Sequence, residues 1–176
     1  MILGDSGVGK TSILYRYLYD KFDSSNLPTL GASFKSRVLS VPSQGDIKLN
    51  LWDTAGQEKF KSLTRMYYQD AEAALIVYDT TFRESFENAK NWVRDLKDNA
   101  NVPDMVIAFV GNKCDMTDKQ EITMEEAHHE SSQLGASIFK EISAKDNTGI
   151  NELFTLIAST LLKRQKAKEV RKNYAS

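Results

Sequence analysis

The sequence predicts an α/β protein with a mostly parallel six-stranded sheet, one antiparallel edge strand and helices on both faces. Apolar runs alternate with stretches of helical periodicity along the whole chain, which is the pattern of a sheet covered by helices. The runs at 73–79 and 105–112 are almost entirely apolar, as expected for central strands buried on both faces. A glycine-rich loop at 4–11 follows the first apolar residues.

Composition indicates a single domain. The chain has 176 residues, of which 41% are hydrophobic and 27% charged, and its net charge is −1. This balance gives no reason to expect a nucleic acid or a membrane surface as the partner of the whole domain. The only cysteine, Cys114, excludes an internal disulfide. No apolar run approaches the ~20 residues of a membrane helix, so we expect a cytosolic type of domain.

The first half of the chain predicts a short strand, a helix and a hairpin. Residues 1–3 form a strand stub that leads into the glycine loop. The helix that follows the loop has an apolar stripe at helical spacing: Ile13, Leu14, Tyr17 and Leu18. Strands at 33–41 and 46–53 are joined by the turn-rich residues 42–45. Apolar and polar residues alternate in 46–53, as in a half-exposed antiparallel strand at a sheet edge.

The second half predicts three more strands, each followed or preceded by a helix. A helical stripe links the two central strands and consists of Phe86, Ala89, Val93 and Leu96. Thr123 and Glu126 form a possible capping box for a helix that runs through Leu134. A short strand at 137–142 precedes a last helix, which is marked by Leu153, Phe154, Ile157 and Leu161.

Four polar segments follow the predicted strands, at 4–12, 53–57, 111–115 and 143–145. In a parallel sheet with helices on both faces, ligands bind at the carboxyl ends of the strands. We therefore expect these four segments to converge on one site.

The first segment, GDSGVGKT, fits a loop whose backbone N–H groups surround phosphate. Lys10 can reach β- and γ-phosphates, and the Thr11 hydroxyl can coordinate Mg²⁺. The alternative is an ordinary glycine-rich turn between a strand and a helix.

The second segment, DTAGQ, begins at the end of a strand. Asp53 can hold a metal-bound water, and Gly56 allows a backbone N–H to approach a γ-phosphate. Gln57 can both donate and accept hydrogen bonds, which suits it to orient an attacking water. The alternative is a turn with a capping aspartate and a solvated glutamine.

The last two segments contain groups suited to a guanine base. The Asp115 carboxylate can accept two N–H bonds from guanine, whereas adenine has no donor at N1. Asn112 offers a donor and an acceptor, and the Lys113 stem can lie along a purine face. Residues 143–145 (Ser-Ala-Lys) offer a backbone N–H to a carbonyl oxygen and a second aliphatic stem. The alternative is a pair of ordinary polar turns.

GDSGVGKT, Thr29, WDTAGQ, NKCD and SAK, in this order and at these separations, resemble the motifs of the small GTPases across essentially the whole chain. Within that superfamily the chain is most similar to the Rab proteins in PTLGASF, DTAGQEKF and SLTRMYY. TLGASF and AKNWV resemble the early-endosomal Rabs. The resemblance implies a phosphate-loop G-domain at 1–165, with 166–176 as a basic helix end or the start of a flexible tail.

The resemblance also implies site residues. Phe22 matches the aromatic that stacks edge-on against guanine, and Thr29 matches the threonine that joins Mg²⁺ and senses the γ-phosphate. The expected catalytic residues are Gln57 and Lys10, and the expected metal ligands are Thr11, Thr29 and Asp53. The expected nucleotide contacts are Asp5, Ser6, Gly7, Val8, Gly9, Lys10, Thr11, Ser12, Phe22, Thr29, Gly56, Asn112, Lys113, Asp115, Ser143, Ala144 and Lys145.

Partners follow from the same resemblance. Phe34, Trp52 and Tyr67 match the aromatic trio through which Rabs meet effectors, and we expect an exchange factor and an activating protein as well. A monomer is expected, with no nucleic acid bound. The chain stops at 175–176 without a prenylation signal, so either a tail is omitted or this protein lacks that anchor. With a prenylated tail, it would cycle between the cytosol and the cytosolic face of endomembranes such as endosomes.

These residues predict a GTP-hydrolysing molecular switch that regulates vesicle trafficking, with GTP or GDP and Mg²⁺ bound. The expected step is endocytic, and another trafficking step is the alternative. A phosphate-loop kinase would need a lid and an acceptor site, and neither is inserted in this short chain. A scaffold that binds nucleotide without turnover is disfavoured by Lys10, Thr11, Asp53 and Gln57.

Overall fold

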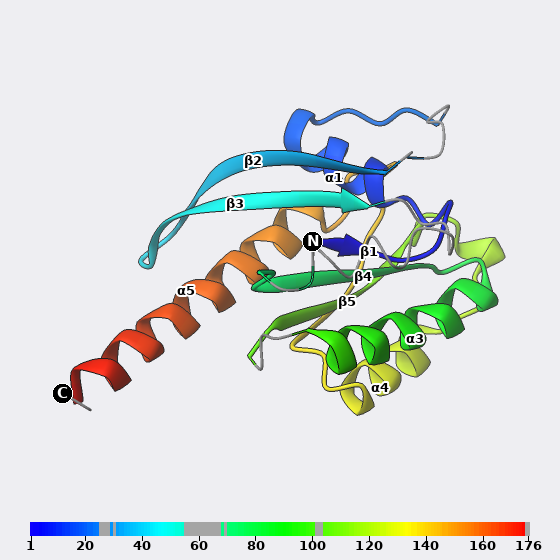
Figure 1. Ribbon diagram of the computed structural model, residues 1–176. Helices are drawn as coiled ribbons and strands as arrows, with labels where there is room; N and C mark the ends of the chain where they lie inside the picture. Colours follow the sequence, from blue (N-terminus) through cyan, green and yellow to red (C-terminus); the bar gives the residue numbers. More distant parts are fainter. Residues whose placement is uncertain (25–28, 30, 55–67, 69, 101–103, 175–176) are drawn as a thin grey trace.

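The computed structural model describes residues 1–24, 29, 31–54, 68, 70–100 and 104–174 (Figure 1). The first elements are β1 (Ile2–Leu3), α1 (Lys10–Tyr19), β2 (Ala32–Val41) and β3 (Gly45–Thr54). They are followed by β4 (Ala73–Asp79), α3 (Arg83–Asn99), β5 (Val106–Asn112) and the short 3₁₀ helix η2 (Thr117–Lys119). The chain continues with α4 (Met124–Gln133), β6 (Ile138–Glu141) and α5 (Ile150–Tyr174).

The six strands form one sheet in the order β2-β3-β1-β4-β5-β6. Only β2 runs against its neighbour β3, while β1 pairs in parallel with β3 and β4, and β5 pairs in parallel with β4 and β6. The predicted fold class is therefore confirmed. The alternation in 46–53 was expected at a sheet edge, but β3 is the second strand and β2 lies at the edge. Leu49 and Leu51 of β3 are buried because they face the core.

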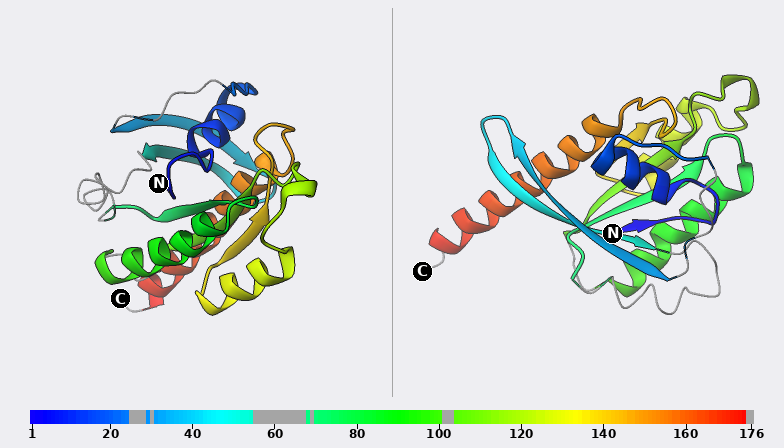
Figure 2. Two further views of the ribbon diagram at one scale, coloured as in Figure 1. Left: turned by 90° about the vertical axis from the view of Figure 1, so that its right-hand side faces the viewer. Right: turned by 90° about the horizontal axis from the view of Figure 1, so that it is seen from above.

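Helices cover both faces of the sheet (Figure 2). Side chains of β4 alternate between the two faces: Leu75 and Val77 pack with α1 and α5, whereas Ile76 and Tyr78 pack with α3 and α4. Because successive side chains of a strand point to opposite faces, a strand covered on both sides must be apolar throughout. This is the physical reason for the continuous run at 73–79.

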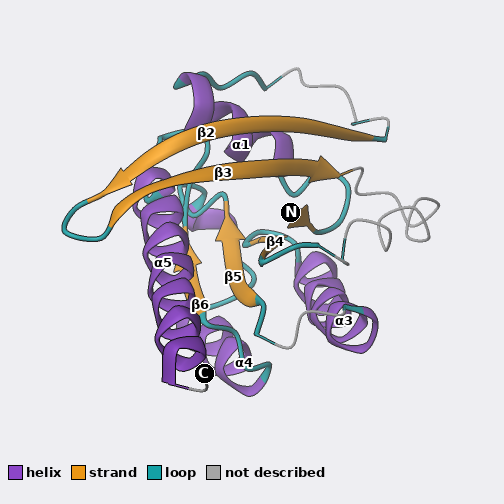
Figure 3. Ribbon diagram, turned by 60° about the vertical axis from the view of Figure 1, so that its left-hand side comes forward, coloured by secondary structure: helices purple, strands orange, loops and turns teal. Residues whose placement is uncertain are grey.

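The β2–β3 hairpin arches over α5 (Figure 3), and α5 continues well past the sheet (Figure 1). Val41, beside the hairpin turn, packs against Ala158 and Leu162 of α5. Beyond them, Nζ of Lys166 donates to the carbonyl of Gln44 at 3.0 Å. Residues 166–174 thus continue the helix of the domain without a break. In the part of the chain that the structure describes, no helix combines the length and apolar character needed to cross a membrane.

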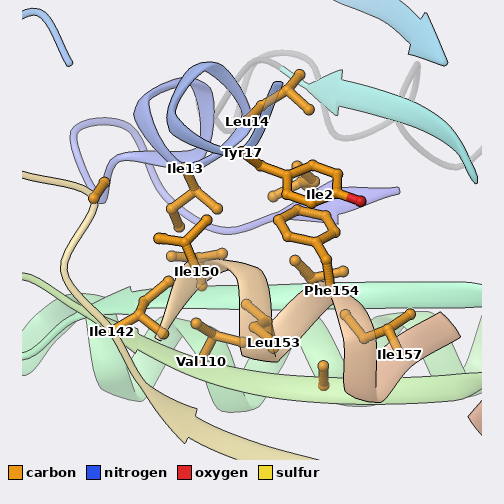
Figure 4. Packing of buried hydrophobic residues seen from close by; sticks show 14 of the residues in the cluster. Ile2, Ile13, Leu14, Tyr17, Val110, Ile142, Ile150, Leu153, Phe154 and Ile157 are labelled. Atoms are coloured by element: carbon orange, nitrogen blue, oxygen red, sulfur yellow. The ribbon is translucent and has the colours of Figure 1, made fainter. Parts of the chain in front are cut away.

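Helix α1 is fixed to the sheet and to α5 by its apolar stripe (Figure 4). Ile13 and Leu14 are fully buried, and the ring of Tyr17 stacks on that of Phe154 with centroids 3.7 Å apart. The packing holds the helix that begins at Lys10, so it also fixes the loop in front of that helix.

At α4, the predicted cap forms. The Thr123 hydroxyl accepts from the backbone N–H of Glu126 at 3.2 Å. The Glu126 carboxylate pairs with Arg83 of α3, so the capping box forms in one direction only.

Candidate nucleotide-binding site

A pocket of about 450 Å³ opens at the carboxyl ends of the strands, and residues from all four predicted polar segments line it. The described part of the segment 53–57 contributes only Thr54. Predicted contacts in the wall are Ser6, Gly7, Gly9, Lys10, Thr11, Ser12, Phe22, Thr29, Asn112, Lys113, Asp115, Ala144 and Lys145. The expected convergence is therefore present in the structure.

The loop 4–9 needs glycine at two close approaches. At Gly4, whose φ is 140°, an added Cβ would lie 2.2 Å from the carbonyl oxygen of Val77. At Gly9, whose φ is 95°, it would lie 2.3 Å from the amide nitrogen of Asn112. A side chain at either position would push the loop off the strand ends and close the space that faces the pocket.

Lys10 lies in the first turn of α1 with only 5% of its surface exposed. Its ammonium donates to the carbonyl oxygens of Gly4 and Asp5, both at 2.7 Å. Burial lowers the pKa of Lys10 to about 8, and the nearby carboxylates of Asp53 and Asp5 oppose this shift. A buried cation at a loop lined by N–H groups is well placed to bind an anion such as phosphate.

Three side-chain oxygens cluster beside Lys10. The Thr11 hydroxyl donates to Oδ2 of Asp53 at 2.6 Å and lies 2.8 Å from the Thr29 hydroxyl. Burial raises the pKa of Asp53, while the hydrogen bond from Thr11 and the charge of Lys10 oppose the rise. Its Oδ1 is buried without a hydrogen-bond partner among the described residues.

This cluster fits a small hard cation that keeps several of its waters. Hydroxyl and carboxylate oxygens suit Mg²⁺, which is usually held by one or two carboxylates together with substrate phosphates. The described residues contain no group of three or more His, Cys, Asp or Glu that could hold a metal by themselves. The unpartnered Oδ1 of Asp53 is the polar atom available for a metal-bound water.

At the other end of the pocket, Asn112 ties two loops together. Its Nδ2 donates to the carbonyl of Val8 at 2.9 Å, and its Oδ1 accepts from the backbone N–H of Ala144 at 3.1 Å. The Asp115 carboxylate accepts from the Ser143 hydroxyl at 2.7 Å through Oδ1. Asn112 thus acts on the shape of the pocket, and Asp115 is oriented by the neighbouring loop.

Lys113 also bridges two segments. Its ammonium donates to the carbonyl of Gly7 at 2.9 Å and pairs with Oδ2 of Asp79 at 2.5 Å. Asp79 ends β4 and is itself held, because its Oδ1 accepts from the backbone and the hydroxyl of Thr81. These contacts direct the aliphatic stem of Lys113 across the pocket wall.

Four predicted residues support the pocket from behind its wall: Val8, Asp53, Ser143 and Asp5. The Asp5 carboxylate accepts from Asn88 at 2.7 Å and from the indole N–H of Trp92 at 3.0 Å, both on α3. The Asp5 side chain thus anchors the loop to α3, while its backbone carbonyl accepts from Lys10. Gly56 and Gln57 lie outside the described residues.

The expected effector aromatics are described in part. Phe34 of β2 and Trp52 of β3 lie opposite each other in the antiparallel pair, with ring centroids 5.0 Å apart. Phe34 is 49% exposed, which is unusual for so large an apolar side chain. Tyr67 lies outside the described residues.

The structure adds residues that the sequence analysis did not select. Asp23, Ser24, Thr54 and Met116 line the pocket, and Asp79 and Arg16 hold its loops. Asp79 is the last residue of a strand, and Asp53 is the last but one of another. Since ligands bind at the carboxyl ends of the strands, this position could have identified Asp79 from the sequence. Arg16 is a single basic residue on a helix, and its role depends on contacts that no motif indicates.

The fold and this pocket define a phosphate-loop nucleotide-binding protein of the small GTPase class. A family model described as Ras family matches residues 1–163, so the chain belongs to the Ras family.

Curated relatives at 40–47% identity include "Ras-related protein Rab-22A" from Mus musculus, 47% identical over 157 residues. That match covers 89% of this chain and 79% of the relative. "Ras-related protein Rab5" from Nicotiana tabacum is 44% identical over 167 residues, which are 95% of this chain and 82% of the relative. "Ras-related protein Rab-8A" from Gallus gallus is 41% identical over 170 residues, 96% and 81% of the two chains. The chain is therefore a Rab small GTPase, a switch of vesicle trafficking that binds guanine nucleotide and hydrolyses GTP.

Proposed function

We propose that this Rab GTPase holds GTP or GDP with Mg²⁺ in the pocket described above and acts in endocytic trafficking at endosomal membranes. The observation that carries the proposal is the convergence of motif residues from distant parts of the chain on one pocket of about 450 Å³. The proposed GTP-binding domain spans 1–165, and 166–176 form a basic helix end or the start of a tail.

The phosphate end is assigned to the loop 4–11. The backbone N–H groups and the Lys10 ammonium bind the β- and γ-phosphates, since both present positive charge to the same space. The hydroxyls of Thr11 and Thr29 and the Asp53 carboxylate would hold Mg²⁺, which neutralises phosphate charge when bound. The buried, unpartnered Oδ1 of Asp53 supports this assignment.

Hydrolysis is assigned to positioning and electrostatics, which supply most of the catalysis in phosphoryl transfer. Gln57 orients the attacking water through its donor and its acceptor. Lys10 stabilises the charge that develops on the phosphate oxygens. An activating protein would accelerate this step.

The base end is assigned to Asp115, Lys113, Phe22 and residues 143–145. Asp115 accepts from guanine N1–H and the exocyclic amine, while the stems of Lys113 and Lys145 pack on the purine faces. Adenine would desolvate the Asp115 carboxylate without offering it these donors. The lost hydrogen bonds cost binding free energy, so adenine is disfavoured.

Phe34, Trp52 and Tyr67 are assigned to effector binding. A half-exposed aromatic pair on a sheet is a good interface anchor.

An endosomal location is assigned to the protein as a whole. The motifs TLGASF and AKNWV and the similarity to Rab-22A and Rab5 support the endosomal assignment. We propose a monomer that reaches the membrane through a lipidated tail.

The test is competition binding of GTP, GDP and ATP to the nucleotide-free protein, with and without Mg²⁺. We expect guanine nucleotides to bind far more tightly than ATP, and Mg²⁺ to strengthen GTP binding. Imaging of the tagged full-length protein beside endosomal markers tests the location. Equal affinities for GTP and ATP would contradict the proposed pocket, and a location away from endosomes would contradict the proposed step alone.

A further inference from the structure

Arg16 connects the helix of the phosphate loop to the loop at the base end of the pocket. It lies on α1, two turns after the loop, and its side chain is 14% exposed. Its Nε donates to the carbonyl of Ala144 and its Nη2 to the carbonyl of Lys145, both at 2.8 Å. Both of these loop residues line the pocket.

The remaining donors of Arg16 hold the end of its own helix. Nη1 donates to the carbonyl of Asp20 at 3.0 Å and to its Oδ1 at 3.1 Å. Asp20 caps α1 in a left-handed conformation, with φ at 52°. Its Oδ1 also accepts from Nδ2 of Asn147 at 3.0 Å, so a second contact ties the same loop to α1.

The loop itself is closed at its base and held from its other side. Ser143 and Thr148 exchange two backbone hydrogen bonds, at 3.1 and 3.0 Å. The N–H of Ala144 is bound by Asn112 while its carbonyl is bound by Arg16. The loop backbone is therefore fixed between β5 and α1, and Arg16 supplies the contacts on the α1 side.

Only arginine can make this set of contacts with one side chain. A planar guanidinium presents its N–H groups in a fixed fork, which matches two neighbouring carbonyls and a third acceptor at once. Lysine would keep the charge but not the geometry.

We propose that Arg16 is a positioning residue for the base end of the pocket, which sets how long guanine nucleotide stays bound. The inference rests on the proposed guanine pocket. Arg16 holds the backbone at 144–145 against the purine, and its hydrogen bonds to the described residues go to Ala144, Lys145 and Asp20, away from the cluster of Thr11, Thr29 and Asp53. Loss of the guanidinium should therefore accelerate nucleotide release while leaving the chemistry of the loaded complex intact.

The experiment compares wild type with Arg16→Ala, Arg16→Lys and Asn147→Ala. Release of a fluorescent GDP analogue is followed in Mg²⁺, and GTP hydrolysis is followed as a single turnover of the protein already loaded with GTP. Arg94→Ala is the matched control, because Arg94 is an exposed arginine of α3 whose side chain donates to Asn91 of the same helix, away from the pocket wall described above. Thermal melting of the loaded proteins reports folding.

We expect release from Arg16→Ala to be about tenfold faster or more, with Arg16→Lys and Asn147→Ala between it and wild type. Hydrolysis should stay within about twofold of wild type, and Arg94→Ala should match wild type in both assays. If Arg16→Ala does not fold, the other two variants carry the test.

Release within twofold of wild type in every Arg16 and Asn147 variant overturns the inference. Release and hydrolysis that change by the same factor also overturn it, because that is the result of general disruption. If wild type itself binds ATP as tightly as GTP, the guanine pocket fails and this inference fails with it. Normal guanine preference in wild type with unchanged release in the variants overturns the Arg16 inference alone.

Discussion

The Thr11 hydroxyl donates a hydrogen bond to the Asp53 carboxylate across 2.6 Å, although 42 residues separate the two in the chain. The contact joins the start of α1 to the end of β3, and the Thr29 hydroxyl lies 2.8 Å from the same Thr11 oxygen. Three segments thus meet at a few oxygens beside the buried Lys10. The affinity of this cluster for a metal would therefore depend on the position of each of the three segments.

Replacement of Thr11 by asparagine tests the metal assignment. Thr11→Asn removes the hydroxyl ligand, so we expect GTP to lose more affinity than GDP, because GTP depends more on Mg²⁺. Thr11→Ser keeps the hydroxyl and is the matched control. The ratio of GTP to GDP affinity at fixed Mg²⁺ is the measurement, and an unchanged ratio would make Thr11 purely structural.

Replacement of Asp115 by asparagine tests base recognition. Asp115→Asn removes the acceptor for guanine N–H groups, and the new amide can donate to the C2 carbonyl of xanthine. We expect guanine affinity to fall about 10–150-fold, as for a lost charged hydrogen bond of ~1.5–3 kcal/mol, and relative xanthine affinity to rise. Competition with GTP, XTP and ATP measures this. Asp118→Asn, on the exposed η2 turn, should behave as wild type.

The lowered pKa of Lys10, about 8, predicts proton uptake when nucleotide binds. Phosphate stabilises the ammonium and raises its pKa, so binding takes up about half a proton near pH 8 and almost none near about pH 6.5. Because uptake means that affinity falls as pH rises, binding should weaken above about pH 8. Calorimetry of the nucleotide-free protein in buffers of different ionisation enthalpy measures the uptake. Lys10→Arg, which stays charged, should show none; equal uptake in both proteins would assign the proton to another group.

Most of the fold could be predicted because its patterns are local. Strand β4 is buried on both faces and is apolar up to its last residue, Asp79, and α1 shows its stripe at helical spacing. The position of β3 inside the sheet could not be predicted in the same way. The alternation of apolar and polar residues in β3 shows that one face of the strand packs on the core and the other faces solvent. An edge strand and the strand next to it can both have this pattern, so the pattern does not tell them apart.

The pocket could be predicted as far as its residues belong to motifs at strand ends. Asp5 shows the limit, because its place in the loop predicts a nucleotide contact but does not indicate that Asn88 and Trp92 of α3 bind its carboxylate. Arg16 shows the same limit in the opposite sense, because it belongs to no motif and yet holds a loop of the pocket. Both roles depend on which distant elements pack together, and the spacing of residues in one segment does not contain that information.

Replacement of Gln57 by leucine tests the proposed positioning of water. Gln57→Leu keeps similar bulk but removes the donor and the acceptor, so hydrolysis should fall at least about tenfold, or ~1.4 kcal/mol of barrier. GTP binding should survive, since the proposal assigns the ground-state phosphates to the loop 4–11. Single-turnover hydrolysis with and without an activating protein is the measurement. Rates equal to wild type in both conditions would place the positioning of water elsewhere.

The central claim is that the convergent pocket binds guanine nucleotide and turns GTP over. Single-turnover assays of the wild-type protein with GTP and with ATP, each in Mg²⁺ and after its removal, test this claim most directly. We expect GTP to be converted to GDP and phosphate in a first-order reaction that needs Mg²⁺, and ATP to remain unbound. Tight GTP binding without any phosphate release, or turnover of ATP at the same rate as GTP, would contradict the account.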